Sequence, residues 1–220
     1  MTAGYRIVEL GPADIDRIMA LERQAFDPSI QADAEVILYR FGLGHRMLGA
    51  EEDGRLVGTI GFSLIRFDRH DMTGFPPTFK AYSTQAVPPE PDTVCIYSLG
   101  VEPGSRVLQV AKLLVHSCFD EGFHGGLGQA IADGPLPSYA GNSQVKQRPE
   151  VRAMVDRYVA TGQLPSHEEF LHDPVLALYR RLTECNFIAL LPDFIADDEA
   201  SGGWRVLLWG EFKGPYLPTG

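Results

Sequence analysis

The segment between residues 93 and 122 constrains the fold of this chain more than any other. Residues 93–101 (TVCIYSLGV) are rich in β-branched and aromatic side chains, which favours a buried strand. Residues 102–105 include a proline and a glycine, and neither continues a strand ladder. From residue 106 onward the apolar positions have helical spacing, at Leu108, Ala111, Val115, Cys118 and Phe119. A strand, a tight turn and a helix in this order place unpaired backbone N–H groups at the helix start, which is a typical anion-binding site.

The size and charge of the chain limit its architecture and its partners. The chain has 220 residues, of which 45% are apolar, so we expect a single α/β domain over residues 1–220 with a helical insertion at 134–172. The net charge of −10 argues against nucleic-acid binding, because that binding requires Lys and Arg to neutralise phosphates.

Other features indicate a cytoplasmic protein with no membrane partner and no metal site. No apolar run reaches the roughly 18 residues of a transmembrane helix. The first ten residues alternate apolar and polar side chains, unlike a secretory signal. The three cysteines, Cys95, Cys118 and Cys185, lack metal-ligand spacing, and their odd number favours reduced, buried thiols.

The periodicity of the remaining chain predicts further strands and helices. Strands are expected at residues 5–10, 46–51, 56–67, 126–132, 187–194 and 204–212, and helices at 12–26, 33–41, 144–162 and 174–184. Asp53-Gly54 is a strong turn signal for a hairpin. Ser166 and Glu169 fit a capping box for a short helix, and Asp173 fits the N-cap of the helix at 174–184. Asn186 is expected to supply the left-handed end of that helix.

Two features suggest an open or mobile region beside the sheet. Gly58 and Gly61 lie within one predicted strand, where glycine indicates a bend or a close approach of two backbones. Residues 68–92 form a long connection that contains the sequences FPPTF and PPEP. Because connections of this length are usually functional, we interpret it as a flap over one end of the sheet.

The strand end SLGVEP, residues 98–103, and the loop RVLQVA, residues 106–111, form a pair of motifs. Together with the order of the elements, they resemble the GNAT superfamily of acyl-CoA-dependent N-acyltransferases over nearly the whole chain. In that family a bulged strand precedes a pyrophosphate loop, Q/R-x-x-G-x-G/A, which opens a helix. Arg106 and Ala111 match the ends of this loop, whereas Gln109 stands where the family has glycine. The resemblance implies a mixed, mostly antiparallel seven-stranded sheet with splayed central strands, flanked by helices.

Three flanking stretches resemble one subgroup of that family, whose members are sometimes fused to nitrilase-like hydrolases. They are FPPTF at 75–79, DGPLPSY at 133–139 and LLPDFIADDEASGGWRVLLWG at 190–210. The similar stretches of the subgroup are PPTW, GGRIPGY and LPDY…D-S-x-G-Y. This chain has Pro135 where the subgroup carries arginine.

The resemblance implies acetyl-CoA, or another acyl-CoA, as the co-substrate. Backbone groups of a bulge expected at Leu99, Gly100 and Val101 would pair with the pantetheine arm, and an N–H group there would stabilise the oxyanion. The helix start would hold the pyrophosphate through the backbone of Arg106, Val107, Leu108, Gln109, Val110, Ala111 and Lys112.

The resemblance also implies a tyrosine that protonates the leaving thiolate, in a motif like L-Y-x-x-x-G-F. Here Leu178-Tyr179 lies three residues farther from Asn186-Phe187 than in that motif, one helical turn away on the same face. Tyr179 is therefore the candidate acid, with a buried core tyrosine as the alternative.

No single base stands out. Tyr97 and Ser98 could order a water. Glu22 could reach from the first helix, but we expect it foremost as an exposed rim carboxylate. His116 fits an ordinary helix residue. Asp197, Asp198 and Glu199 fit a solvated hairpin that would attract a cationic acceptor.

These inferences predict an N-acyltransferase, foremost an N-acetyltransferase, acting on a small-molecule amine or a protein amino group. The alternative is a catalytically weak or inactive GNAT-like domain that senses acyl-CoA. A Rossmann-type enzyme would need G-x-G-x-x-G after a strand, and no predicted strand is followed by it. The insertion at 134–172 could form a dimer contact, so a homodimer is an open alternative to a monomer.

Overall fold

The computed structural model describes residues 4–141, 145–214 and 216. The chain forms two compact units. The first unit comprises residues 1–68, 83–130 and 211–220, and the second comprises residues 69–82 and 131–210. Seven strands follow the order β1-β2-β3-β4-β5-β7-β6, and the pairs β1–β2, β2–β3, β3–β4 and β6–β7 are antiparallel. The predicted mixed α/β architecture with a seven-stranded sheet is therefore confirmed.

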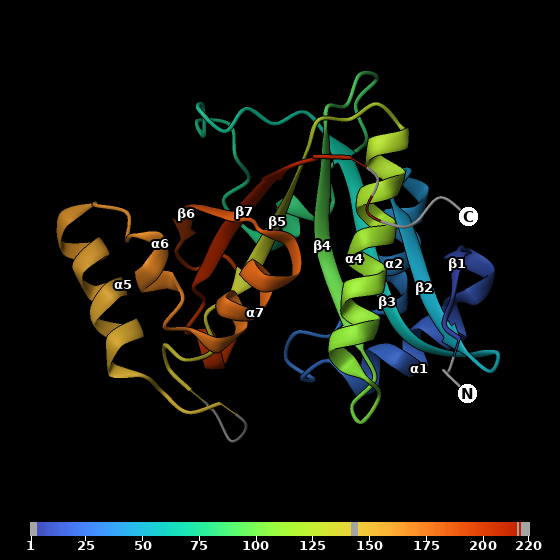
Figure 1. Cartoon of the computed structure of the whole chain (residues 1–220), viewed down its shortest axis with the longest axis horizontal. Coiled ribbons are helices and arrows are strands. Elements are labelled where there is room, and N and C mark those ends of the chain that lie inside the picture. Colours follow the sequence, from blue (N-terminus) through green and yellow to red (C-terminus); the bar gives the residue numbers. More distant parts are fainter. Residues whose placement is uncertain (1–3, 142–144, 215, 217–220) are drawn as a thin grey trace. The chain divides into compact units, whose positions relative to one another are not determined.

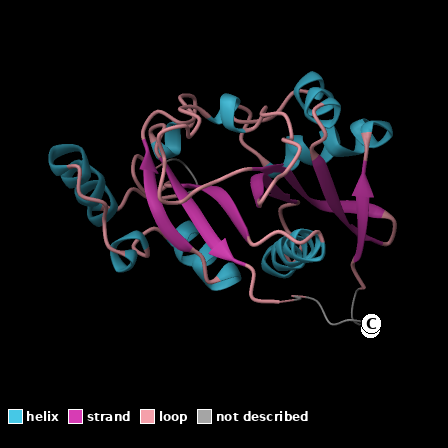
Figure 2. Ribbon diagram, turned by 90° about the horizontal axis from the view of Figure 1, so that it is seen from above, coloured by secondary structure: helices cyan, strands magenta, loops and turns pink. Residues whose placement is uncertain are grey.

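The first unit packs helices on both faces of its strands (Figures 1 and 2). Its elements are β1 (Arg6–Leu10), α1 (Ile15–Ala25), α2 (Ala34–Gly42), β2 (Arg46–Glu52), β3 (Arg55–Ile65), β4 (Thr93–Val101) and α4 (Val107–His124). A short 3-10 helix, Pro12–Asp14, precedes α1. Asp53 and Gly54 both have positive φ, at 51° and 79°, as the predicted two-residue hairpin turn requires.

The second unit contains α3 (Phe79–Tyr82), most of β5 (Gln129–Pro135), α5 (Pro149–Thr161), α6 (His167–Phe170), α7 (Pro174–Thr183), β6 (Asn186–Leu191) and β7 (Arg205–Glu211). A 3-10 turn, Glu199–Ser201, lies between β6 and β7. One apolar core joins α5, α6 and α7 to β6 and β7, and it includes Met154, Phe170 and Phe187. The Ser166–Glu169 capping box and the Asp173 N-cap are both present as predicted.

Several boundaries differ from the sequence-based expectation. β5 begins at Gln129 rather than at 126, because Gly126 has a φ of +79° and continues the turn that ends α4. The left-handed end of α7 is Glu184, with a φ of 51°, and not Asn186, which already belongs to β6. The expected start of the α5 region at Gln144 lies outside the described residues.

All three cysteines are buried, as predicted, and none of the three is in a disulfide. Among the described residues, no helix has both the length and the apolarity needed to cross a bilayer.

Candidate functional site

A β-bulge interrupts β4 at Tyr97. Gly61 of β3 pairs with Ser98 and the next residue, Phe62, pairs with Ile96, so Tyr97 is an extra residue on β4. The directions of the β4 side chains before and after Tyr97 confirm that one residue is inserted there. A methyl group added at Gly122 of α4 would lie 2.6 Å from Val94, whereas one added at Gly100 would lie 2.7 Å from Phe26, next to α1. Val94 and Gly100 are an even number of residues apart, so only an inserted residue can turn them to opposite faces.

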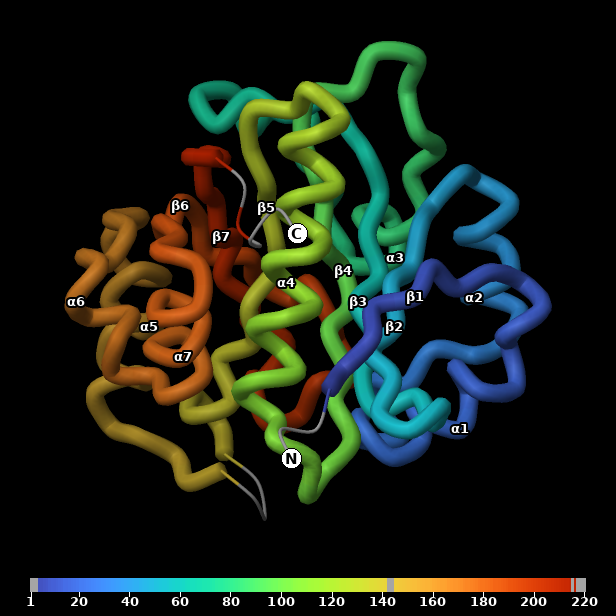
Figure 3. Tube along the Cα trace, turned by 45° about the vertical axis from the view of Figure 1, so that its right-hand side comes forward, coloured from blue at the N-terminus to red at the C-terminus, as the bar shows by residue number. Residues whose placement is uncertain are grey.

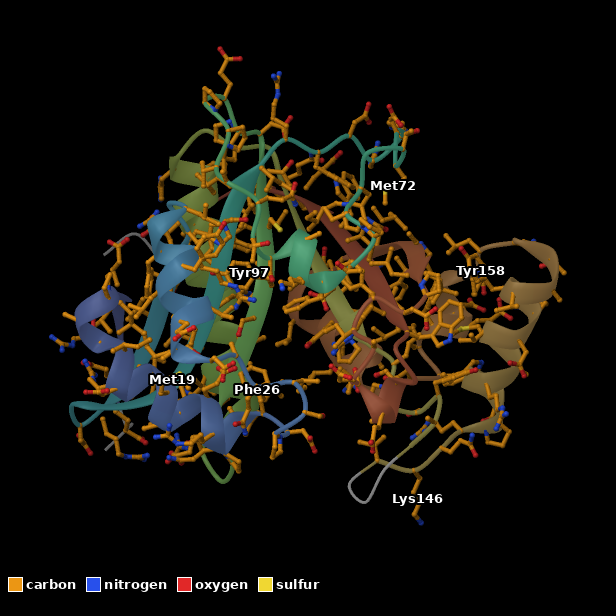
Figure 4. The ribbon with its side chains drawn as sticks, turned by 180° about the vertical axis from the view of Figure 1, so that it is seen from behind. Met19, Phe26, Met72, Tyr97, Lys146 and Tyr158 are labelled. Carbon is orange, nitrogen blue, oxygen red and sulfur yellow. The ribbon has the colours of Figure 1, made fainter. Side chains whose placement is uncertain are left out.

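The bulge directs the Tyr97 ring onto the face of the sheet that α1 and α2 cover (Figure 4). Gly61 leaves room for this ring, because a methyl group there would lie 2.8 Å from it. The Arg40 guanidinium lies 4.7 Å from the ring centroid, and the His45 ring lies 5.4 Å away, centroid to centroid. Burial raises the pKa of Tyr97, and the positive charge of Arg40 opposes that rise. The Tyr97 hydroxyl is therefore a neutral phenol at physiological pH.

The bulge was expected at Leu99–Val101, and this expectation is wrong. Residues 99–101 form a regular ladder with Ile60, Thr59 and Gly58 of β3. Burial nevertheless changes at the bulge, because Thr93–Tyr97 are all buried whereas Ser98, Leu99 and Val101 are half-buried. The backbone beyond the bulge is thus the less enclosed part of β4.

The turn from β4 into α4 is built by local contacts, and Figure 3 shows the chain returning along β4 as α4. Gly104 has a φ of +87°, a conformation that favours glycine. The Glu102 carboxylate accepts a hydrogen bond of 3.0 Å from the Ser105 hydroxyl and pairs with Arg55 of β3. These contacts fix the direction in which α4 begins.

The first turn of α4 is exposed at the side chains of residues 106–109. Leu108 is 56% exposed, so its predicted place on the buried face is wrong, whereas Ala111, Val115, Cys118 and Phe119 are buried as expected. The N–H of Val107 donates to the Ser105 carbonyl at 2.7 Å, and those of Gln109 and Val110 donate to the Arg106 carbonyl at 2.8 and 3.0 Å. An anion bound at the start of α4 would accept hydrogen bonds from the same N–H groups that now donate to the Ser105 and Arg106 carbonyls.

Glu22 of α1 is buried, with 7% of its surface exposed, so the expected exposed rim carboxylate is wrong. Its Oε1 accepts a hydrogen bond of 2.9 Å from the backbone N–H of Ala32, which ties the loop between α1 and α2 to α1. Burial raises the pKa of Glu22, and this hydrogen bond and the charge of Arg40 oppose the rise.

In the second unit, the candidate acid Tyr179 lies half-buried on α7. A methyl group added at Gly134 of β5 would lie 3.4 Å from its ring, so α7 and β5 approach closely here. Burial, followed by the negative charge of Asp133, raises the pKa of Tyr179 to about 12, and Arg205 opposes the rise. His116, by contrast, is half-buried on α4 beside the Tyr216 ring, at 5.5 Å between centroids.

A buried charge cluster in the second unit was not predicted from the sequence. Arg205 of β7 is 6% exposed and lies 3.7 Å from Asp133 of β5 and 2.7 Å from Asp198. The signal was present as an arginine inside the apolar strand WRVLLW. Asp197 and Glu199 are exposed, as a solvated hairpin requires, but Asp198 is buried, so that expectation is wrong for Asp198.

Comparisons with known proteins were made on this geometry. A family model described as the acetyltransferase (GNAT) family matches residues 15–133. No curated protein sequence gives a significant match.

Three solved structures illustrate the likeness of fold. The loading GNATL domain of CurA from Lyngbya majuscula has a TM-score of 0.71 at 16% identity, covering 94% of this chain and 98% of that one. The GphF GNAT-like decarboxylase in complex with isobutyryl-CoA has a TM-score of 0.69 at 18% identity, with the same coverage. The aminoglycoside 6'-N-acetyltransferase from Enterococcus faecium has a TM-score of 0.56 at 17% identity, covering 98% of this chain and 99% of that one. At these identities the likeness shows the fold, and the family match over more than half of the chain shows that it belongs to the GNAT family.

Proposed function

We propose that this protein is an acyl-CoA-dependent N-acyltransferase, foremost an N-acetyltransferase, in which an amine attacks the thioester carbonyl directly. The observation that carries the proposal is the bulge of β4 at Tyr97, followed at once by the exposed first turn of α4. Family membership adds support, because the matched residues 15–133 include both features.

The start of α4 fits the pyrophosphate of CoA. Residues 106–112 carry two cations, Arg106 and Lys112, both exposed, and the positive end of the helix dipole lies among them. Gln109 is exposed, so its side chain can turn into solvent and leave the backbone approachable. In the proposed complex the backbone of Leu99, Gly100 and Val101 pairs with the pantetheine arm.

The proposed roles of the two tyrosines differ. Tyr97 is packed between Arg40 and His45, so it would help to order a water together with the half-buried Ser98. Tyr179 would protonate the departing thiolate. Because the pKa of Tyr179 is about 12 and that of an ordinary thiol is about 8.5, full transfer of this proton is uphill by about 5 kcal/mol. Tyr179 would therefore donate only as negative charge develops on sulfur.

The acceptor is proposed to be an amine of a small molecule or of a protein. Related folds include an acetyltransferase of ribosomal protein S18 alanine and one of aminoglycosides, so the fold alone favours neither class.

The first test is ligand-dependent stability followed by turnover. At one hundred times its Kd, acetyl-CoA should raise the free energy of unfolding by about 2.7 kcal/mol, seen as a higher Tm. Thiol release should then depend on the addition of an amine from a panel of small amines and peptides. Absence of a Tm shift with acetyl-CoA, propionyl-CoA and CoA would overturn the cofactor assignment. Binding without thiol release would favour the sensor alternative, and CO₂ release from malonyl-CoA without an amine would favour a decarboxylase.

A matched pair of variants tests the pyrophosphate site itself. Gln109→Glu adds a negative charge at the exposed helix start, where it should weaken CoA binding by at least about fivefold through like-charge repulsion of about 1 kcal/mol. Gln109→Gly restores the residue of the family motif and should bind CoA at least as tightly as the parent. Isothermal titration of both variants measures this difference, and equal Kd values for the two would place the pyrophosphate elsewhere.

A further inference from the structure

We propose that His45 takes up the proton that the attacking amine loses, and that this proton travels through the Tyr97 hydroxyl and one water held by Ser63. The inference rests on the proposed function and supplies the base that the sequence did not reveal. It is carried by two buried polar atoms, His45 Nδ1 and Ser63 Oγ, which have no hydrogen-bond partner within the part of the chain that the structure describes. His45 and Ser63 are 4% and 1% exposed, and both belong to the first unit.

His45 and Ser63 lie opposite each other at the end of one ladder. Arg46, the first residue of β2, pairs with Phe62 of β3, so the antiparallel register places His45 across from Ser63. Side chains opposed in this way lie about 5 Å apart at Cβ. The Arg46 guanidinium lies 5.6 Å from the Phe62 ring centroid and also pairs with Glu121 of α4. Because side chains alternate along a strand, His45 and Ser63 point to the other face, which α1 and α2 cover.

The Tyr97 hydroxyl lies on that same face (Figure 4). A methyl group added at Gly61 would lie 2.8 Å from the Tyr97 ring and 3.2 Å from its hydroxyl oxygen. Gly61 and Ser63 are two residues apart on β3, so they share a face. The His45 ring lies 5.4 Å from the Tyr97 ring, centroid to centroid. A phenol, a serine hydroxyl and an imidazole nitrogen therefore border one small region, and three polar partners are what a buried water typically has.

The His45 ring is held in the tautomer that can accept a proton at Nδ1. Its Nε2 lies 2.6 Å from the Gln85 carbonyl oxygen, which can only accept, so Nε2 carries the hydrogen and Nδ1 has a lone pair. Burial lowers the pKa of His45, the bond with Gln85 partly opposes this, and the charge of Arg40 adds to the lowering. The ring is therefore neutral at pH 7.

The charged and titratable groups around this region come from three elements. They are Arg40 of α2, Glu22 of α1, and Tyr97 and Cys95 of β4. Arg40 disfavours a second positive charge on His45, and Glu22 offsets part of the Arg40 charge. A proton taken up by His45 is therefore held only briefly and returns to solvent before the next turnover.

Tyr97 connects this region to the proposed reaction centre. Gly61, beside the Tyr97 hydroxyl, pairs with Ser98, and Ile60 pairs with Leu99, where the proposed pantetheine arm begins. The hydroxyl of Tyr97 is a neutral phenol, so its oxygen can accept one proton while its own hydrogen leaves. His45 acts through Tyr97 and needs no contact with the substrate.

The proposed reaction conserves atoms and charge. The ammonium acceptor first loses one proton to solvent, and its free amine nitrogen attacks the thioester carbonyl to form the C–N bond. The second proton on that nitrogen passes to the Tyr97 oxygen, the Tyr97 hydroxyl hydrogen passes to the water, and a proton of the water passes to His45 Nδ1. The C–S bond breaks, and the sulfur gains a proton that the proposed acid Tyr179 gives and regains from solvent. His45 then releases its proton, so the net products are an amide, the free thiol of CoA and one proton.

His45→Gln tests the proton acceptor, because glutamine keeps a donor for the Gln85 carbonyl but has no titratable nitrogen. With both substrates saturating, kcat of the parent should fall below pH 6.5, and His45→Gln should lose this acidic limb and lower kcat at pH 7.5 by about 100-fold or more. The exposed His124→Gln is the control and should keep both kcat and the limb. Both variants should retain the Tm shift with acetyl-CoA, and an acidic limb retained in His45→Gln would overturn the inference.

Ser63→Ala tests the water, and part of this test does not depend on activity. It should lower kcat by about fivefold, as for the loss of one hydrogen bond, and keep the acidic limb. In ¹⁵N spectra at pH 7.5, His45 should show a protonated Nε2 and an unprotonated Nδ1, assigned by their loss in His45→Gln. Ser63→Ala should shift the Nδ1 resonance more than that of Nε2.

Two outcomes of the spectra would contradict the proton route, namely a protonated Nδ1 at pH 7.5 in the parent or an Nδ1 resonance that Ser63→Ala does not move. Failure of the proposed function would look different. The parent would then release no thiol with any amine, whereas the spectra of His45 would still report its tautomer and its water.

Discussion

At the scale of single residues, the Glu22 carboxylate anchors the loop between α1 and α2, while burial of its charge lowers stability. Its carboxylate loses solvation in the first unit but holds the Ala32 N–H, and Arg40 lies near enough to stabilise its charge in part. Because burial dominates, the folded chain binds a proton at Glu22 more tightly than the unfolded chain does. The contribution of Glu22 to stability is therefore largest below its unfolded pKa and is lost as pH rises through its folded pKa.

Replacing Glu22 with glutamine should reveal that dependence. The glutamine oxygen still accepts from Ala32, and its neutral amide resembles the protonated acid. We expect Glu22→Gln to unfold with at least the parent stability at pH 7.5 and with a smaller loss of stability between pH 5 and pH 7.5. Urea denaturation at the two pH values measures this, with the exposed Glu35→Gln as control. A glutamine variant that loses as much stability as the parent over this range would contradict the prediction.

At the scale of the elements, contacts between neighbours hold the proposed catalytic groups in place. Asp173 is fully buried at the N-cap of α7, where its Oδ1 accepts from the N–H groups of Val175 at 2.8 Å and Leu176 at 3.3 Å. Its Oδ2 accepts from the N–H of Ser138 at 3.0 Å, which joins α7 to the segment after β5. The position of Tyr179, two turns along α7, depends on this anchor.

Removing the anchor should destabilise the second unit. We expect Asp173→Ala to lower the free energy of unfolding by about 2–4 kcal/mol, since it removes a helix cap and leaves a buried N–H of Ser138 unpaired. Asp173→Asn keeps one acceptor and should cost less. Chemical denaturation of both variants tests the order, and an alanine variant as stable as the asparagine variant would show that the cap contributes little.

The packing of α1 on β4 gives a second prediction at this scale. Gly100→Ala should cost about 1–3 kcal/mol, because its methyl group would lie 2.7 Å from the Phe26 ring and 3.2 Å from Ala25. In the background Phe26→Ala the same substitution should cost much less. A double-mutant cycle measures the coupling, and additive effects within about 0.5 kcal/mol would exclude this contact as the cause.

At the scale of the whole molecule, His45 should make stability fall on acidification. Its Nε2 lies 2.6 Å from the Gln85 carbonyl, which can only accept, so Nε2 carries the hydrogen. Among the described residues its buried Nδ1 has no hydrogen-bond partner. Burial lowers the pKa of His45, the hydrogen bond with Gln85 partly opposes this, and the charge of Arg40 lowers the pKa further. The unfolded chain therefore takes up a proton first as pH falls below about 6.5, and the folded state loses stability until its own pKa is reached.

A variant of His45 tests this dependence. His45→Gln keeps a donor for Gln85 but cannot titrate. Below pH 6.5 its free energy of unfolding should therefore fall less steeply than that of the parent, and the two slopes should differ by up to about 1.4 kcal/mol per pH unit. The exposed His124→Gln is the control and should follow the parent. Guanidinium unfolding between pH 7 and pH 5 measures the slopes, and equal slopes for the two variants would contradict the assignment.

Local patterns predicted most of the fold, because β4, α4, the hairpin turn and the caps of α6 and α7 depend on neighbouring residues. The bulge was misplaced because its position depends on Gly61 of the neighbouring strand, where a methyl group would meet the Tyr97 ring. The Arg205 cluster was missed because it, too, depends on residues that are far apart in the sequence. It joins β5, β7 and the turn between β6 and β7, and no local pattern indicates which carboxylates will meet a buried arginine.

The bulge at Tyr97 has a consequence for how this chain tolerates insertions and deletions. Removing Tyr97 would shift every later residue of β4 by one place, so Gly100 would turn from α1 toward α4 and Val101 the other way. Point substitutions at Tyr97 should therefore be far milder than its deletion, although both alter the same position. A compensating insertion between residues 98 and 101 would restore the directions of the strand end and of the turn into α4. Natural homologues that lack a residue at 97 are thus expected to carry an extra one before the first turn of α4.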